Sequence, residues 1–280
     1  MNVCEQLRSL LVSERPLVMP DAYDALSARL IEMAGFRAIQ CSGFSMALAS
    51  RAAPEPRLGF EENLEITRKI VEAVQVPVMA DGEDGFGGPE RVFESVAAFA
   101  DAGVAGINIE DQMLGAPGPK AVVDSALMVE KIRAAREGAD SSGAGKLVLN
   151  ARTDALSVMP DRRAGLDESI RLGNRYLEAG ADLVFVTGVR MIEEVRELTS
   201  QIKGPVSIAA GVFDNIGAMS IKDLCACGVA RVSLPTVAVL SAIEAIRHML
   251  SVVRESGDFT GLTQHGRLAG MKIIGEILGK

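Results

Sequence analysis

Acidic side chains follow two apolar runs in the first half of the chain, at the point where each run ends. The run VMA is followed by Asp81, Glu83 and Asp84, and the run INI is followed by Glu110 and Asp111. Continuous apolar runs of this kind are typical of strands buried on both faces, and parallel strands bring their carboxyl ends to one edge. Carboxylate oxygens are the ligands that Mg²⁺ prefers. These acids therefore predict a divalent-cation site at the mouth of a parallel sheet.

Strand-like and helix-like segments alternate along the whole chain, which is the pattern of a parallel α/β protein. We count eight strand–helix pairs, and this count favours a modified (β/α)₈ TIM barrel over a doubly wound sheet. In such a barrel the functional residues lie at the carboxyl ends of the strands, where the acids fall. We expect one domain over residues 1–280, with the barrel proper at about 16–255 and an additional C-terminal helical segment at about 256–280.

Hydrophobic spacing and cap residues give the expected limits of these elements. A long loop is expected over 42–60, and a flexible connection over 137–145. Glycines separate a helix from the next strand at four similar places, where a left-handed residue ends the helix: Gly35, Gly103, Gly180 and Gly228. The expected strands are 17–20, 37–42, 77–80, 106–110, 146–153, 182–187, 205–209 and 230–234. The expected helices are 21–34, 61–74, 89–102, 124–136, 166–179, 191–202, 220–227 and 237–254.

Composition limits the possible partners and the compartment. The formal charge is −8 and the pI is about 5.0, which argues against nucleic-acid or membrane-surface partners because those favour clustered Lys and Arg. No apolar run reaches the roughly 18 residues of a membrane span, and the first residues lack the pattern of a secretory signal, so a cytoplasmic location is predicted. The 4 cysteines are too few for a disulfide framework.

Four segments together carry a resemblance to a known family. DAYDALSARLIEMAGFRAIQCSGFS, DGEDGFGG, INIEDQ and LNARTDA occur in this order and spacing. Over roughly residues 16–255 the chain resembles the isocitrate lyase and phosphoenolpyruvate mutase superfamily, and its ending is similar to a short branch of it. The resemblance implies a modified TIM barrel that binds Mg²⁺, with Mn²⁺ as the alternative ion, and acts on a small 2-oxo or 2-hydroxy carboxylic acid through an enolate. It also implies a homo-oligomer, dimer or tetramer, because many relatives exchange a C-terminal helix.

The resemblance also assigns roles to the residues that match the family's motifs. Asp81, Glu83 and Glu110 match the acids that hold the metal, directly or through water, and Asp81 also contacts substrate. The substrate carboxylate and oxo group are expected to bind the turn after the second strand and an arginine, with Arg152 and Ser42 as the catalytic candidates. An arginine fork and the N–H groups of a turn both suit anions. These substrate-binding residues are Ser42, Gly43, Phe44, Ser45 and Arg152.

The chain also departs from the family's pattern. Cleaving members carry a K-[KR]-C-G-H loop with an acid/base cysteine after the fourth strand, whereas this chain has MLGAPGPK over residues 113–120. The second metal acid is Glu83, where Asp is usual. Thr187 replaces the glutamate of the sixth strand, and SIAAGVFD lacks the asparagine and glutamate of the seventh. Decarboxylation of an oxaloacetate-like substrate, which needs no cysteine acid, therefore fits better than isocitrate-type cleavage.

Each candidate has a structural alternative beside its functional interpretation. Asp81 and Glu83 could be solvated turn acids, Arg152 could pair with Asp154 for purely structural reasons, and Ser42 could simply end a strand. Lys120 is interpreted as an exposed loop residue, as the loop lysine of the mutases has no clear counterpart here.

Two classes of function stay open. We favour a lyase-type enzyme; the alternative is a catalytically degenerate oxo-acid- and metal-binding protein, or a phosphonopyruvate mutase or hydrolase.

Overall fold

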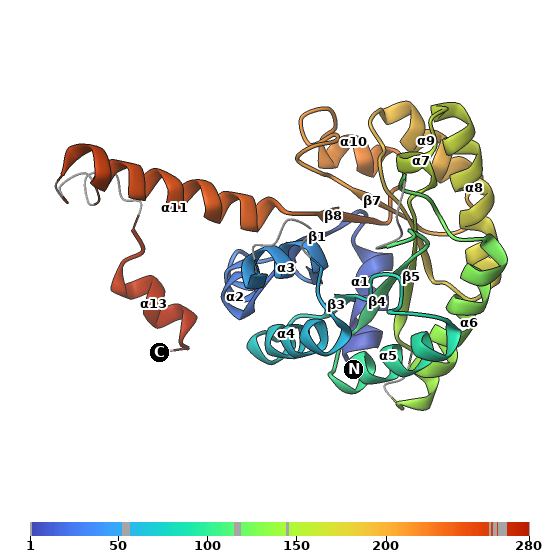
Figure 1. The fold of residues 1–280 in the computed structure, drawn as a ribbon, viewed down its shortest axis with the longest axis horizontal. Helices are drawn as coiled ribbons and strands as arrows, with labels where there is room; N and C mark the ends of the chain where they lie inside the picture. Colours follow the sequence, from blue (N-terminus) through green and yellow to red (C-terminus); the bar gives the residue numbers. More distant parts are fainter. Residues whose placement is uncertain are drawn as a thin grey trace.

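Eight parallel strands close into a barrel in the order in which they follow in the chain (Figure 1). The structure is a computed structural model that describes residues 2–51, 57–114, 119–143, 146–257, 259, 262 and 268–279. The fold confirms the predicted (β/α)₈ barrel, and every strand lies where an apolar run was expected, with ends that differ by a few residues. The strands are β1 (Leu17–Ala22), β2 (Ile39–Cys41), β3 (Val78–Asp81), β4 (Gly106–Glu110), β5 (Val148–Thr153), β6 (Leu183–Val186), β7 (Val206–Ala209) and β8 (Arg231–Leu234).

Helices surround this barrel and connect its strands (Figure 1). Pro89 occupies the first turn of its helix, and the Asp124 carboxylate accepts a hydrogen bond from the Ala126 N–H, so both predicted helix starts are confirmed. The helices are α1 (Val3–Ser13), α2 (Ala25–Met33), α3 (Gly43–Arg51), α4 (Phe60–Ala73), α5 (Pro89–Asp101), α6 (Ser125–Ser141), α7 (Ala155–Val158), α8 (Arg162–Glu178), α9 (Ile192–Gln201), α10 (Ile221–Ala226), α11 (Val237–Ser256) and α13 (Met271–Ile277).

Two sequence expectations about connections are wrong, and two helices were not expected. The expected loop over 42–60 contains helix α3, because its small residues and alanines are compatible with a helix once Ser42 caps it. The expected flexible connection over 137–145 begins instead with the last turn of α6, since Gly138 sits in the helix against the backbone of Phe93, where a Cβ would lie 2.4 Å from the Phe93 carbonyl oxygen. Helices α1 and α7 were not expected at all.

Helix α1 closes the amino-terminal end of the barrel. Leu7, Leu10 and Leu11 are buried on one face of α1 and pack against residues at the starts of several strands, including Met79 and Val148. Each fully buried side chain of this kind contributes roughly 1.5–3 kcal/mol. Because this end is filled, a small molecule can approach the barrel interior from the carboxyl ends of the strands.

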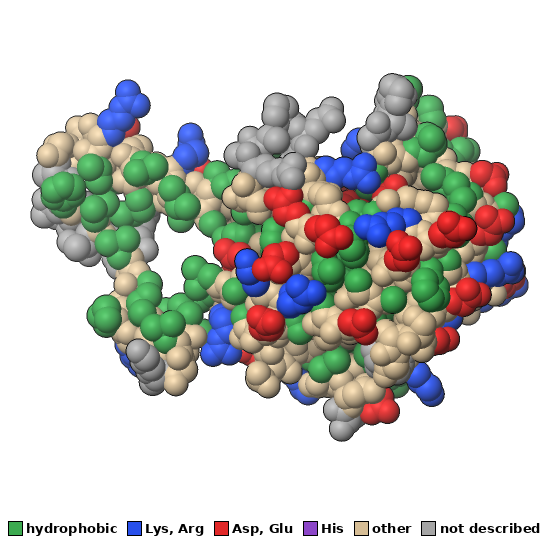
Figure 2. All heavy atoms as spheres, turned by 60° about the horizontal axis from the view of Figure 1, so that its bottom comes forward, with side chains coloured by type: hydrophobic (Ala, Val, Ile, Leu, Met, Phe, Trp, Pro, Cys, Tyr) green, Lys and Arg blue, Asp and Glu red, His purple; other side chains and the backbone are tan. Residues whose placement is uncertain are grey.

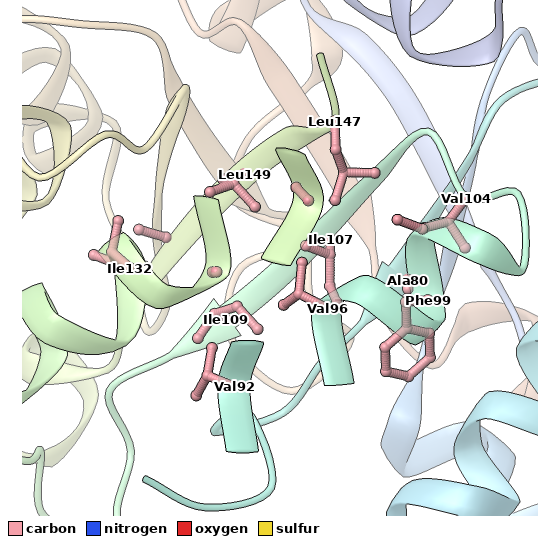
Figure 3. Packing of buried hydrophobic residues seen from close by; sticks show 14 of the residues in the cluster. Ala80, Val92, Val96, Phe99, Val104, Ile107, Ile109, Ile132, Leu147 and Leu149 are labelled. Carbon is pink, nitrogen blue, oxygen red and sulfur yellow. The ribbon is translucent and has the colours of Figure 1, made fainter. Parts of the chain in front are cut away.

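The largest cluster of buried hydrophobic side chains lies between β3–β5 and the helices α5 and α6. Val92, Val96 and Phe99 follow one another at helical spacing. Figure 3 shows Val92 and Val96 beside Ile109 and Ile107 of β4, and Phe99 beside Ala80 of β3. The four expected joint glycines all have positive φ, at +89° for Gly35, +87° for Gly103, +115° for Gly180 and +76° for Gly228, so these predicted left-handed helix ends are confirmed. The packing of α5 and α6 against the sheet holds β3 and β4, which carry the acids, in fixed positions relative to each other.

Helix α11 leaves the barrel and forms an arm with α13 (Figure 1). Of the α11 residues, Val239 is buried, whereas Ile246 is 60% and Leu250 is 66% exposed. Figure 2 shows hydrophobic side chains gathered on this arm, while acidic and basic side chains alternate over the barrel surface. The eighth helix of the sequence pattern therefore exists but does not cover the barrel wall as the other helices do.

Candidate active site at the carboxyl ends of the strands

A cavity of about 350 Å³ opens at the carboxyl ends of the strands. Its wall includes residues from all parts of the barrel, because the strand ends form a closed ring. Polar residues on this wall include Asp21, Ser42, Asp81, Arg152, Thr187 and Ser233.

Three carboxylates meet beside this cavity, and of these residues Asp81 lines its wall. One oxygen each from Asp81, Glu83 and Glu110 lies within 4.8 Å of the other two. Asp81 pairs in register with Asn108 of β4, and Glu110 lies two residues further along, so both side chains point to the same face of the sheet. Oxygens bound directly to one octahedral Mg²⁺ lie at most about 4.2 Å apart. The cluster is of a size that fits a magnesium ion held directly or through water, and the three acids converge as the sequence predicted.

The loop after β3 places Glu83 beside the other two acids. The Gly82 N–H donates to the Asn108 carbonyl at 2.9 Å, and the Glu110 N–H donates to the Glu83 carbonyl at 2.8 Å. Glu83 itself has φ +50°, a left-handed conformation that is uncommon for a residue with a side chain. These hydrogen bonds attach the loop after β3 to the carboxyl-terminal end of β4. The left-handed conformation of Glu83 then sets the direction of its carboxylate.

The start of α3 lies against the same acids. The Gly43 N–H donates to Asp81 Oδ2 at 2.8 Å, and a Cβ on Gly43 would lie only 2.0 Å from Glu83 Oε1. Ser42 Oγ accepts the Ser45 N–H at 3.3 Å and donates to Ser45 Oγ at 3.0 Å, so Ser42 caps α3. Ser42 and Phe44 line the cavity, whereas Ser45 is buried behind Ser42.

Arg152 lies between the metal acids and a further carboxylate. Its Nη1 is 2.6 Å from Glu110 Oε2, and its Nε and Nη2 each donate to Asp154 at 2.9 Å. The pairing with Asp154 that was considered as a structural alternative is therefore present. These contacts use three of the five N–H groups of the guanidinium, so two remain. Because Arg152 lines the cavity, these two can bind an anion there.

Burial and mutual repulsion shape the charge of the acidic cluster. Burial, and after it the neighbouring Asp81, raise the pKa of Glu83 to about 8, although Arg152 and Arg57 oppose this rise. Burial also holds the pKa of Glu110 well above its usual range, although the nearby Arg152 opposes this. Three carboxylates this close cannot all ionise without a cation between them. The cluster thus has the chemistry of a divalent-cation site.

The two other acids of the sequence motifs turn away from the cavity. Asp111 accepts the Tyr176 hydroxyl at 2.8 Å and the Asp154 N–H at 3.0 Å, which braces the end of β5. Asp84 pairs with Arg57 at 3.2 Å, and the buried Lys131 of α6 donates to the Asp84 carbonyl at 2.6 Å. Asp84 and Asp111 therefore support the loops that carry the three converging acids, a distinction that the apolar runs alone did not make.

Sequence reasoning missed a polar group on the wall formed by β1 and β8. Asp21 and Ser233 line the cavity, and the Ser233 hydroxyl donates to Asp21 Oδ1 at 3.0 Å. Below them, Arg231 is fully buried in the barrel interior and donates to Ser207 Oγ at 2.7 Å. A signal was present, because the run LVMP ends at Asp21 in the same way that VMA ends at Asp81.

The positions that depart from the family pattern also lie at this cavity. The Thr187 hydroxyl donates to Asp154 Oδ1 at 2.8 Å, and Ala209 contributes only a methyl group to the wall. Lys120 is exposed, as expected, but it lines the cavity mouth. Residues 115–118 of the loop after β4 lie outside the described residues.

Comparisons with known proteins agree with this geometry. Residues 7–254 match the family described as phosphoenolpyruvate phosphomutase. The chain is 34% identical over 209 residues to 2,3-dimethylmalate lyase of Eubacterium barkeri, covering 73% of this chain and 70% of the relative. It is 30% identical over 263 residues to 2-methylisocitrate lyase of Halalkalibacterium halodurans, covering 91% and 83% of the two chains.

A solved structure shows the same fold with ligands in place. A phosphonopyruvate hydrolase in complex with oxalate and Mg²⁺ matches with a TM-score of 0.86 at 28% identity, covering 100% of this chain and 95% of that one. The relatives are lyases together with hydrolases and mutases of phosphonates, which confirms the predicted class of enzyme. The chain therefore belongs to the phosphoenolpyruvate phosphomutase family, within the isocitrate lyase and phosphoenolpyruvate mutase superfamily.

Proposed function

We propose that this protein is a Mg²⁺-dependent lyase that acts on a small 2-oxo or 2-hydroxy carboxylic acid through an enolate. The observation that carries the proposal is the convergence of Asp81, Glu83 and Glu110 beside a cavity-lining arginine. These three acids would hold the ion. Bound there, Mg²⁺ supplies positive charge beside the enolate oxygen that develops as a bond to the neighbouring carbon breaks.

The residues of the chain bind and orient the substrate. The two remaining N–H groups of Arg152 would hold the substrate carboxylate, and the Arg152 side chain is fixed by Asp154 and Glu110 so that little freedom is lost on binding. Ser42 lies on the cavity wall at the start of α3 and would contact the carboxylate or the oxo group from the other side. Phe44, which is 49% exposed, would cover the substrate and exclude water.

Decarboxylation remains the chemistry that we favour. The loop over residues 113–120 contains no cysteine, and Cys41, which does line the cavity, is fully buried. Burial raises the pKa of the Cys41 thiol, so the side chain stays protonated and unreactive. A carboxy-lyase reaction on an oxaloacetate-like acid needs no thiol acid. A degenerate binding protein and a phosphonopyruvate mutase or hydrolase are the alternatives.

Oxalate binding tests the proposal, because oxalate is a planar mimic of the pyruvate enolate. With Mg²⁺ present, oxalate at about a hundred times its Kd should stabilise the fold by roughly 2.7 kcal/mol, a shift of a few degrees in Tm. Arg152→Lys should lose most of this Mg²⁺-dependent shift, because a lysine cannot form the bidentate contact. Lys120→Ala, which removes an exposed charge at the cavity mouth, is the matched control and should keep it. Absence of any Mg²⁺-dependent oxalate shift in the wild type would refute the proposal.

We also propose that the protein is a homo-oligomer assembled through the arm. A helix of 20 residues spans about 30 Å, and α11 and α13 carry exposed apolar side chains that water would otherwise cover. Those more than half exposed are Ile246, Leu250 and Met271, together with Leu278 directly after α13. The mass in solution, measured by light scattering, should be that of a dimer or tetramer. Ile246→Asp with Leu250→Asp should give monomers, whereas a monomeric wild type would contradict the proposal.

Other expectations about the setting of this protein stay predictions. Among the described residues no helix is long and apolar enough to cross a membrane. The single domain over residues 1–280, the cytoplasmic location and the lack of a nucleic-acid partner rest on sequence composition and pattern.

A further inference from the structure

Asp21 is a buried acid on the cavity wall that the metal cluster does not use. It is 5% exposed and lines the cavity near the end of β1. The Ser233 hydroxyl donates to its Oδ1 at 3.0 Å, and no other described residue is hydrogen-bonded to the Asp21 side chain. The Oδ2 atom is therefore the one that can reach a molecule bound in the cavity.

The other ionisable groups of the cavity wall are committed or open to solvent. Asp81 belongs to the metal cluster, and Asp154 is paired with Arg152. Asp214 and Lys120 line the cavity mouth but are exposed, so bulk water competes with them. Among the described residues lining this cavity, Asp21 is the acid that is shielded from solvent, outside the metal cluster and without an ion-pair partner.

A buried cation lies beneath this acid. Arg231 of β8 donates to Ser207 Oγ and to Gln40 Oε1, and its Nε lies 3.2 Å from Met19 Sδ. Among the described residues no carboxylate lies within ion-pair distance of Arg231, although it is fully buried. A buried guanidinium needs negative charge nearby to offset its lost hydration. Its charge lowers the pKa of Asp21 and would also favour an anionic enolate in the cavity above it.

Resting on the proposed function, we infer that Asp21 is the catalytic acid/base that exchanges a proton with C3 of the substrate. In the cleavage direction, the electron pair of the enolate C2–C3 double bond takes the proton of the Asp21 carboxyl. The new C3–H bond forms, the carboxyl O–H bond breaks, and C2 recovers its carbonyl group while Asp21 becomes a carboxylate. In the reverse direction the Asp21 carboxylate removes the C3 proton of a 2-oxo acid.

The electrostatics of the wall support this role. The pKa of Asp21 is raised to about 8. Burial is the largest cause and Asp81 adds to it, whereas Arg231, the Ser233 hydroxyl and Arg152 oppose the rise. The side chain therefore holds a proton near neutral pH and can also release it, which is the property required of a general acid/base. The role also accounts for a carboxyl at this depth without an ion-pair partner.

Exchange of the C3 protons of pyruvate for deuterium tests the inference, because it requires enolisation without bond cleavage. The wild type with Mg²⁺ should exchange pyruvate in deuterium oxide, followed by NMR. Asp21→Asn should lower the exchange rate by at least about 100-fold, a typical contribution of a general base, and should keep the Mg²⁺-dependent oxalate shift in Tm. Asp214→Asn removes an exposed carboxylate from the same cavity and should exchange within twofold of wild type. In Asp21→Ala, added formate should restore part of the exchange.

The outcomes separate this inference from the proposed function. Exchange by Asp21→Asn within threefold of wild type would overturn the role of Asp21. A wild type that binds oxalate with Mg²⁺ but does not exchange pyruvate would also overturn it, while the metal and carboxylate site would stand. If the wild type shows neither the oxalate shift nor exchange, both proposals fail. Should Asp21→Asn not fold, the formate response of Asp21→Ala decides, and no restoration would count against the inference.

Discussion

Replacing Gly43 by alanine should weaken metal binding without destabilising the fold. The added Cβ would lie 2.0 Å from Glu83 Oε1, 3.0 Å from Glu83 Cδ and 3.2 Å from Asp81 Oδ2. Ordinary contacts are at about 3.5–4.0 Å, so the Glu83 carboxylate must move by more than 1 Å. The backbone of Gly43 is helical, and alanine is favoured over glycine in a helix by up to about 1 kcal/mol. Stability and metal affinity should therefore change in opposite directions.

The size of the effect follows from what Glu83 contributes. Changes to groups that orient a metal ligand usually cost 10–100-fold in affinity, which corresponds to about 1.4–2.7 kcal/mol. We expect a loss of that size in Mg²⁺ affinity, measured by titration calorimetry, with an unchanged or slightly raised Tm in the absence of metal. Gly59→Ala is the matched control, because nothing lies within 4 Å of its added Cβ. Mg²⁺ affinity within twofold of wild type in Gly43→Ala would show that Glu83 is not held where metal binding needs it.

Three further predictions test the metal site, the reaction and the charge of the cavity. Asp81→Ala should abolish Mg²⁺ binding but leave the circular dichroism spectrum and cooperative unfolding intact, since this residue lies at the rim; unchanged calorimetric affinity would contradict its assignment. Isocitrate and 2-methylisocitrate should not be cleaved at a useful rate, and release of glyoxylate or pyruvate faster than about 1 per second in a coupled assay would refute this. Without divalent cations, the free energy of unfolding should fall as pH rises from about 5 to 8, because Asp21 and Glu83 have a folded-state pKa of about 8 and the unfolded chain releases those protons first. Mg²⁺ should reduce this fall, and denaturant titrations that show stability rising over that window would contradict the assigned charge states.

The sequence by itself predicted the barrel and the three acids that converge beside the cavity. Strand and helix signals are local, because periodicity, caps and left-handed glycines depend on residues a few positions apart. The position of an acid at the end of an apolar run can also be recognised locally. Because the carboxyl ends of all barrel strands meet at the cavity, such an acid is expected to lie there. Family resemblance added the prediction that Asp81, Glu83 and Glu110 act together with Arg152, and the structure brings these four side chains together beside the cavity.

Local patterns failed where a residue's role depends on partners distant in the chain. Asp84 and Asp111 look like Asp81 and Glu110 in sequence, but Lys131 of α6 and Tyr176 of α8 fix them outside the cavity. Helix α1 is short, and its apolar face is buried only by packing against the starts of the barrel strands. An isolated helix of this length is marginal in water, so packing rather than propensity decides it.

Only the closed tertiary structure decided the wall formed by β1 and β8. Asp21 and Ser233 are separated by 212 positions, and they meet because β1 pairs with β8 when the barrel closes. The same closure buries Arg231 beneath them and seals their surroundings from water, which changes an ordinary aspartate into one that holds its proton. Desolvation depends on the assembled surroundings and not on neighbouring residues in the chain. For this reason the sequence shows that an acid is present at position 21 but not that its pKa is raised.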